Sequence, residues 1–448
     1  MLSTAHKNER RALFTLAIPM ILSNITVPLL GLIDTAVIGH LPHAYFLGGT
    51  AVGSMIITAI IWFCGFLRMS TSGLAAQAFG SNNQQQMLLV LSRGLIVALT
   101  IGLLLVALQQ PFIDGALWLA GGSNEVQLYA RQYSEIRVWG FPAALANLVV
   151  LGWLLGMHKA KQAMWVIILT NVVNLCLDLL FVLGFNWQVQ GVALATLIAE
   201  YSGLLLGLWL IRASIHKQMG ALRSALADIK QQIFARSQLL AYMQLNRDIV
   251  IRTICLELCF IFITFEGAKL GDTVVATNAI LMNFILLISF GLDGIAFGAE
   301  ARVGKAKGAK DLLGLKIAVK VAMVYNLIFA IFYSLFFLLF GKQFILLLSD
   351  IEPVTQLAEQ FLPWITLLPI LACWCYLFDG IYIGLTQGRV MRNSMLIATF
   401  GCFFPVWWLF SSLGNHAIWA ALSIFMVVRG LTLMWHFKHY NADLIKDL

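Results

Sequence analysis

Twelve long apolar runs constrain the fold of this chain more than any other feature of its sequence. Each run is long enough for a helix to cross a bilayer, which takes about 20 residues. A backbone inside lipid must satisfy its own hydrogen bonds, so we expect every run to form a transmembrane helix. The runs cover approximately residues 12–38, 45–71, 87–109, 126–156, 161–184, 189–211, 249–270, 273–300, 312–340, 353–386, 391–413 and 415–437.

The composition indicates a membrane protein. Hydrophobic side chains make up 60% of the 448 residues and charged ones 11%, against about 25% in soluble domains. The mean hydropathy is +0.87. All seven cysteines lie within apolar runs, where we expect reduced thiols packed as small hydrophobes rather than disulfides or a metal site. The predicted fold class is therefore an all-α polytopic membrane protein with twelve transmembrane helices.

The basic residues indicate how the chain is oriented. If the N-terminus is cytoplasmic, all but four of the 29 Lys and Arg residues lie in inner loops or at inner span ends. The positive-inside rule then places both termini in the cytoplasm. The net charge of +8 reflects this topology, so we expect no nucleic-acid partner. The four outer exceptions are Arg131, Arg137, Lys269 and Lys342.

An internal repeat divides the chain into two halves. Gly80 lies in the small-residue stretch after the second apolar run and Gly308 in the stretch after the eighth, at a separation of 308 − 80 = 228 residues, and other short matches recur at the same offset. Six spans in each half give both halves one orientation, which predicts a parallel repeat of two six-helix lobes. We expect an N-lobe at 1–211, a cytoplasmic linker with an amphipathic helix at 212–247, and a C-lobe at 248–448. A calmodulin-type partner site has the same pattern as this linker.

Acidic side chains within the apolar runs are the first candidates for a functional site. A charge at mid-membrane costs about 2.5–3.5 kcal/mol on insertion scales, so an unpaired acid there points to a cationic ligand. Local pairing, or solvation at a span end, is the alternative. The acids concerned are Asp34, Asp178, Glu257 and Asp379.

Polar and aromatic neighbours accompany these acids. Asn171, Asn174 and Asp178 are spaced to share one face of a helix, and Asn147 and Thr196 are candidates to join Asp34 in the same cluster. A purely structural hydrogen-bond network is the alternative for this group. In the second half, Tyr376 and Tyr382 each lie three residues from Asp379. An acid flanked by aromatic rings can bind an organic cation, although core packing explains many aromatic runs.

These features resemble the multidrug and toxic compound extrusion (MATE) transporters, in particular their DinF-like branch. The resemblance covers essentially the whole chain. It is carried by the duplication, the helix with Pro19 and Asp34, the helix with Asn174 and Asp178, and the stretches Asp34-Thr-Ala-Val-Ile-Gly-His-Leu and Leu413-Gly-Asn-His-Ala-Ile-Trp.

The resemblance implies roles for these residues. It implies two lobes that exchange substrate by alternating access, with a bend of the first helix at Pro19. Asp34 and Asp178 match the protonation site of proton-coupled relatives, and Asn147, Asn174 and Thr196 match its hydrogen-bond neighbours. Glu257 and Asp379 match the second-lobe acids of sodium-coupled relatives, and with Tyr376 they are the candidate cation or substrate site of the C-lobe. Glu257 departs from DinF relatives that have an amide there, which leaves the coupling ion open.

We therefore expect a secondary antiporter that exports organic cations in exchange for protons. The alternatives are a sodium-coupled antiporter and a flippase for lipid-linked precursors, which would need basic residues in a central cavity. The sequence contains no H-E-x-x-H, nucleophile elbow or P-loop, so we expect neither an enzyme nor an ATP-driven pump. We expect no cofactor and no metal, with protons as the coupling ion and sodium as the alternative. The expected setting is a monomer in the bacterial inner membrane.

Overall fold

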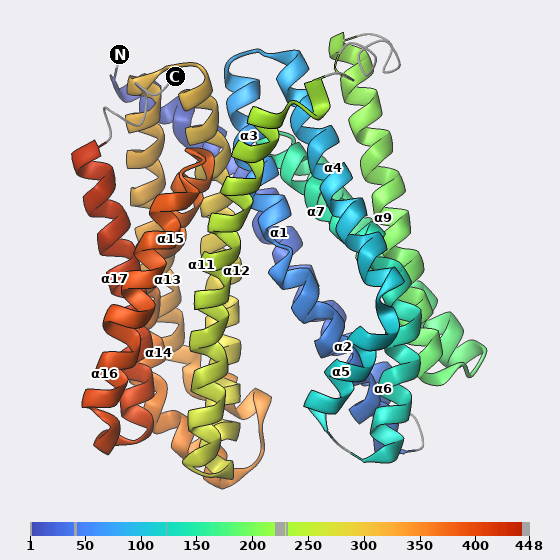
Figure 1. Cartoon of the computed structure of the whole chain (residues 1–448). Helices are drawn as coiled ribbons and strands as arrows, with labels where there is room; N and C mark the ends of the chain where they lie inside the picture. The colour runs from blue at the N-terminus through green and yellow to red at the C-terminus, as the bar shows by residue number, and fades with distance from the viewer. Residues whose placement is uncertain (1, 40–42, 122, 220–228, 230–231, 441–448) are drawn as a thin grey trace. The chain divides into compact units, whose positions relative to one another are not determined.

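The computed structural model describes residues 2–39, 43–121, 123–219, 229 and 232–440 (Figure 1). These residues form helices joined by short turns, and the described part of the chain contains no strand. The chain divides into two compact units, Leu22–Ala241 and a second unit made of Met1–Ile21 with Tyr242–Leu448. The expected all-α fold in two lobes is confirmed.

The unit Leu22–Ala241 contains the second part of α1 and the helices up to α9. Two pairs of helices, α2 with α3 and α6 with α7, continue one another as single rods across short breaks. A π-helical segment, η2, extends α8 directly after Asp178. The bounds are α1 (Leu2–Gly39), α2 (Ala44–Phe63), α3 (Phe66–Gly80), α4 (Gln84–Ala107), α5 (Gln109–Ala120), α6 (Asn124–Arg137), η1 (Val138–Gly140), α7 (Phe141–Gly156), α8 (Ala160–Asp178), η2 (Leu179–Gly184) and α9 (Gln188–Met219).

The other unit contains the first part of α1 and the helices from α11 onward. Its hydrophobic core gathers large buried rings, including Phe284, Phe337, Phe403 and Trp419. The bounds are α11 (Arg236–Lys269), α12 (Asp272–Gly308), α13 (Leu312–Leu348), α14 (Glu352–Gly384), α15 (Gly388–Leu396), η3 (Ile397–Phe403), α16 (Phe404–Leu409), η4 (Ser411–Leu413) and α17 (Asn415–Tyr440).

Nine helical segments among the described residues are long and apolar enough to cross a membrane. They coincide with nine of the twelve expected spans. The other three expected spans also fall on helices: α1, whose side chains from residue 27 onward are not described; α11, which carries several charges; and the interrupted series α15, η3 and α16. Large apolar side chains such as Leu205 and Leu338 are exposed on these segments, as expected of surfaces that face lipid.

The two units repeat each other in backbone detail. Positive φ angles, rare outside glycine, occur at Asn82 and Lys310 (53° and 56°) and again at His158 and Thr386 (60° and 54°), and each pair is 228 residues apart. Directly after the first pair, Asn83 and Asp311 cap the next helix. Their Oδ1 atoms accept backbone N–H groups three residues on, at 3.0 and 2.8 Å. The predicted repeat is thus present in the turns as well as in the helices.

Glycines at the same offset let paired helices approach closely. A Cβ on Gly152 of α7 would lie 2.5 Å from the carbonyl oxygen of Arg68 on α3, and a Cβ on Gly380 of α14 would lie 2.5 Å from that of Ala296 on α12. All four positions are related by the 228-residue repeat. Small residues at such crossings are what allows tight packing between membrane helices.

The division of the chain differs from the expected boundaries in the first helix. Residues 1–21 belong with 242–448 and not with the expected N-lobe at 1–211. The reason is that α1 packs on α12: Arg302 donates to Glu9, with Nε to Oε1 at 2.7 Å, and Leu13 lies against Gly298. Glu9 and Arg302 thus form an ion pair between α1 and α12. The boundary between the two units follows Ile21, two residues beyond Pro19, where the bend of the first helix was expected.

The expected linker at 212–247, with its amphipathic helix, includes residues 220–228 and 230–231, which lie outside the described residues. The flanking helices extend beyond their expected ends, since α9 ends at Met219 and α11 begins at Arg236. The described end of the linker is fixed to α4. Arg93 donates from Nε to the carbonyl oxygen of Ile233 at 2.9 Å and from Nη2 to that of Gln232 at 2.6 Å.

Candidate functional site

The unit Leu22–Ala241 has a buried polar centre on α8 and α9. Asn174 and Asp178 are 1% and 0% exposed, and the Nδ2 atom of Asn174 donates to Asp178 Oδ2 at 3.0 Å and to Thr196 Oγ1 at 3.3 Å. The four-residue spacing on α8 places the first pair one turn apart. Three of the residues expected from the sequence are therefore in mutual contact.

A second polar group lies one turn further along α9. The carboxylate of Glu200 pairs with Arg137 of α6 through two hydrogen bonds of 2.9 and 2.8 Å. Asn147, which we expected beside Asp178, instead donates from Nδ2 to the backbone carbonyl of Glu200 at 2.8 Å. Both members of the ion pair are largely buried. Sequence reasoning missed Glu200, although its place within an apolar run was the signal available.

Asp34 belongs to α1, and its side chain lies outside the described residues. The backbone register nevertheless places it along the helix. Asn171 of α8 donates from Nδ2 to Thr26 Oγ1 of α1 at 2.7 Å. Three long helical segments, α2 with α3, α4, and α6 with α7, lie between α1 and α8 in the chain, so α1 and α8 run in the same direction. Asp34 is eight residues beyond Thr26, and Asp178 is seven beyond Asn171. These distances are about 12 and 10 Å of helix, so the two aspartates fall at similar levels.

The second unit has a buried charged centre around Asp379. Its Oδ2 atom accepts hydrogen bonds from Arg429 of α17, at 2.6 Å, and from Arg252 of α11. Both arginines and the aspartate are almost fully buried. The expectation that Asp379 is an unpaired acid is therefore wrong. Two guanidinium groups share one carboxylate, so these three side chains together carry an excess of positive charge.

The remaining expected residues of this unit do not join Asp379 through hydrogen bonds. Tyr376 bonds through its hydroxyl to Ser289 Oγ of α12 at 2.6 Å, whereas Tyr382 bonds to His436 of α17 at 2.8 Å. Glu257 is half-buried on α11, and Arg252 is a charged neighbour. Glu266 pairs with Lys269 of the same helix at 2.9 Å.

The two centres differ in the chemistry they allow. Asp178 receives a hydrogen bond from a neutral amide, which adds no charge that would oppose protonation. Asp379 is instead engaged by two guanidinium groups, which bond to its carboxylate. Among the described residues, no group of three or more His, Cys, Asp or Glu side chains is placed to hold a metal ion.

A duplicated bundle of apolar helices, with buried acids at different places in its two halves, defines a polytopic membrane transporter. The MatE family model matches the chain twice, at residues 19–180 and 249–409. The chain belongs to this family of transporters, which move small organic substrates across membranes and are not enzymes.

Similarity to individual proteins agrees with the family. The chain is 45% identical to the DNA damage-inducible protein F of Escherichia coli K12, over 96% of this chain and 93% of that protein. It is 22% identical to the multidrug resistance protein NorM of Photobacterium profundum, over 96% of each chain. The structure matches an outward-facing multidrug resistance MATE family transporter with a TM-score of 0.87, at 19% identity and over 97% and 96% of the two chains.

Proposed function

We propose that this chain is a proton-coupled antiporter that exports organic cations by alternating access across the bacterial inner membrane, with both termini in the cytoplasm. The observation that carries this proposal is the buried group Asn174, Asp178 and Thr196. A buried carboxyl group that accepts a hydrogen bond from a neutral amide is suited to bind and release the coupling proton. The register of α1 supports Asp34 as a second acid at the same level.

The pairing of Asp379 favours protons over sodium as the coupling ion. A sodium site in this unit would use Glu257 and Asp379, but the carboxylate of Asp379 is engaged by two arginines. Sodium binding there would first have to release both guanidinium groups into a buried setting, which is costly. Glu257 and Tyr376 remain available for the substrate.

The same contacts weigh against a lipid-precursor flippase. Such a protein would need basic side chains that are free to receive a phosphate. Arg252 and Arg429 are basic and buried, but both bond to Asp379, and Arg137 bonds to Glu200. The names of the relatives, among them a multidrug resistance protein, support export of organic molecules instead.

Transport in proteoliposomes tests the proposal. Vesicles containing the purified protein and the fluorescent cation ethidium receive a proton gradient or a sodium gradient in separate runs. We expect ethidium movement under the proton gradient alone, and its loss in Asp178→Asn. Movement under the sodium gradient alone would assign the coupling to sodium, and movement under neither would contradict the antiporter.

A further inference from the structure

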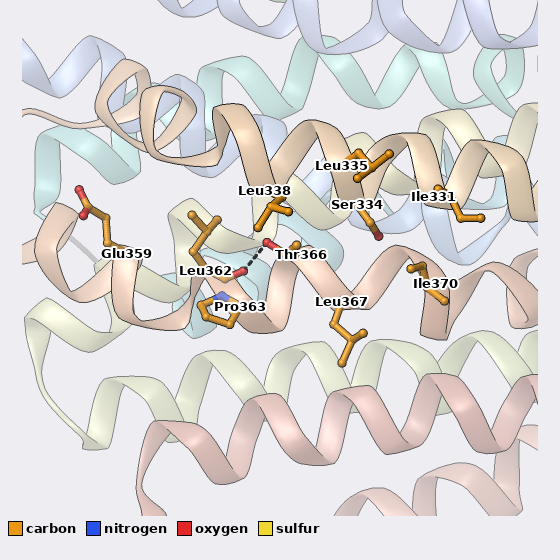
Figure 2. Close-up of a pocket in the computed structure, with 10 residues that line it drawn as sticks. All are labelled: Ile331, Ser334, Leu335, Leu338, Glu359, Leu362, Pro363, Thr366, Leu367 and Ile370. Carbon is orange, nitrogen blue, oxygen red and sulfur yellow. Dashed lines mark hydrogen bonds between the residues drawn. The ribbon is translucent and has the colours of Figure 1, made fainter.

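A groove of about 440 Å³ lies between α13 and α14, entirely within one unit (Figure 2). This volume is in the range of small-molecule sites, about 300–1,000 Å³. Most of the side chains that line it are apolar. They include Ile331, Ser334 and Leu338 from α13, and Leu362, Leu367 and Ile370 from α14.

The groove has the length of one leaflet of the bilayer. Both helices are long and apolar enough to cross the membrane. Figure 2 shows Glu359 at one end of the groove and Ile331 with Ile370 at the other. Glu359 pairs with Lys342, which lies eleven residues beyond Ile331 on α13. Eleven helical residues span about 16 Å, roughly half of a hydrocarbon core of about 30 Å.

The charged end of the groove carries one group of each sign. The Nζ atom of Lys342 lies 3.1 Å from the carboxylate of Glu359, and the two side chains are 61% and 34% exposed. An exposed pair of this kind is weak, about 0–1 kcal/mol, so a ligand with complementary charges can replace it. A phosphate suits Lys342, and an ammonium group with N–H donors suits Glu359.

Ser334 is the polar residue that α13 contributes to the groove lining. It is 7% exposed, and its Oγ atom has no hydrogen-bond partner among the described residues. Thr366 across the groove bonds instead to the carbonyl oxygen of Leu362 in its own helix, at 3.0 Å (Figure 2). The small side chain of Ser334 lines the groove together with Leu335 and Leu338, which are both exposed.

We propose that this groove binds one phospholipid with an ethanolamine headgroup. One acyl chain lies along the groove from Leu338 to Ile331, the phosphate contacts Lys342, and the ammonium group contacts Glu359. In the proposed orientation this lipid belongs to the outer leaflet. An acyl chain gains little by exchanging lipid for protein, so selectivity comes mainly from the headgroup. The inference does not depend on the coupling ion or on the transported substrate.

Photolabelling of the full chain in nanodiscs tests the site. The probes are phosphatidylethanolamine, phosphatidylcholine and phosphatidylglycerol that carry the same diazirine acyl chain. We expect the ethanolamine probe to label peptides around 331–338 and 362–370 about three to five times more than the choline probe, which has no N–H donor. Ser334→Leu fills the groove and should remove this label, whereas the size-matched Ser334→Ala should keep it.

A second protein variant, at the proposed headgroup contact, keeps the test independent of whether Ser334→Leu folds. Glu359→Gln changes a partly exposed position and should lower ethanolamine labelling to the level of the choline probe. Equal labelling by the two probes in the unchanged protein would overturn the proposal. Labelling unaffected by Ser334→Leu, or crosslinks between two copies of the chain at this face, would overturn it as well.

Discussion

The amide of Asn174 donates a hydrogen bond to Asp178 across one turn of α8, at a distance of 3.0 Å. Directly after Asp178, the helix changes to the π-helical segment η2. Such wide turns often mark functional sites in helices. A buried acid that rests on a neutral donor, next to an irregular turn, is the arrangement expected of a group that changes its protonation state during a transport cycle.

Asp178→Asn should abolish proton-driven transport and leave the fold intact, because the amide has the shape of the neutral acid. Asn174→Ala should weaken transport less, since it removes a hydrogen bond worth about 1.5–3 kcal/mol to a charged partner but keeps the carboxyl group. Ethidium transport and thermal unfolding of each variant measure both effects. Wild-type transport by Asp178→Asn would remove this residue from the mechanism.

Asp379→Asn should destabilise the protein by about 3–5 kcal/mol, because it leaves two buried guanidinium groups without their carboxylate. Arg429→Met is the matched variant, and it should cost less because Arg252 and Asp379 remain as a balanced pair. Thermal or denaturant unfolding in detergent compares the two. If Asp379→Asn is the more stable variant, the aspartate is not the common partner of both arginines.

Gly152→Ala and Gly380→Ala should each destabilise by about 1–3 kcal/mol, because the added Cβ meets a backbone carbonyl on the neighbouring helix. Gly115→Ala is the control. A Cβ there meets nothing within 4 Å, and alanine in a helix interior gains about 0.5–1 kcal/mol over glycine. A large difference between the two crossing variants would show that the helix crossings of the two units are not equivalent.

Much of this organisation is predictable from the sequence. The repeat was visible as an offset of short motifs, and the contact between Asn174 and Asp178 followed from helical spacing. Both depend on residues that are close in the chain, or on patterns that repeat along it.

The pairing of Asp379 was not predictable in the same way. Its partners Arg252 and Arg429 lie 127 and 50 residues away, and their positions near span ends suggested solvated charges. The assignment of residues 1–21 to the second unit likewise depends on contacts between α1 and α12 that leave no periodic signal. Contacts between distant helices decide which buried charges are paired.

Single cysteines at Ser81 and Lys310 should be labelled from the same side of the membrane, because the repeat relates their turns. In the proposed orientation that side is the cytoplasm, as it is for the segment 218–232. An impermeant thiol reagent, applied to a variant that lacks the native cysteines, reads this out in right-side-out and inverted vesicles. Labelling of the two positions from opposite sides would contradict the parallel repeat.

Exchange of two protons for one monovalent cation should make transport electrogenic, with Asp34 and Asp178 as the two proton carriers. One unit of pH gradient with 100 mV then supplies about 5 kcal/mol, against about 1.4 kcal/mol for one-to-one exchange. A potassium diffusion potential set with valinomycin should therefore change the ethidium gradient. An ethidium gradient that does not change with the membrane potential would indicate one-to-one exchange.

Proton release on substrate binding tests the central claim most directly. The purified protein in weakly buffered detergent solution receives tetraphenylphosphonium while a pH indicator reports protons released per cation bound. The account predicts release from the unchanged protein, its loss in Asp178→Asn, and its persistence in Glu257→Gln. Release that persists in Asp178→Asn, or binding that displaces sodium and no protons, would contradict it.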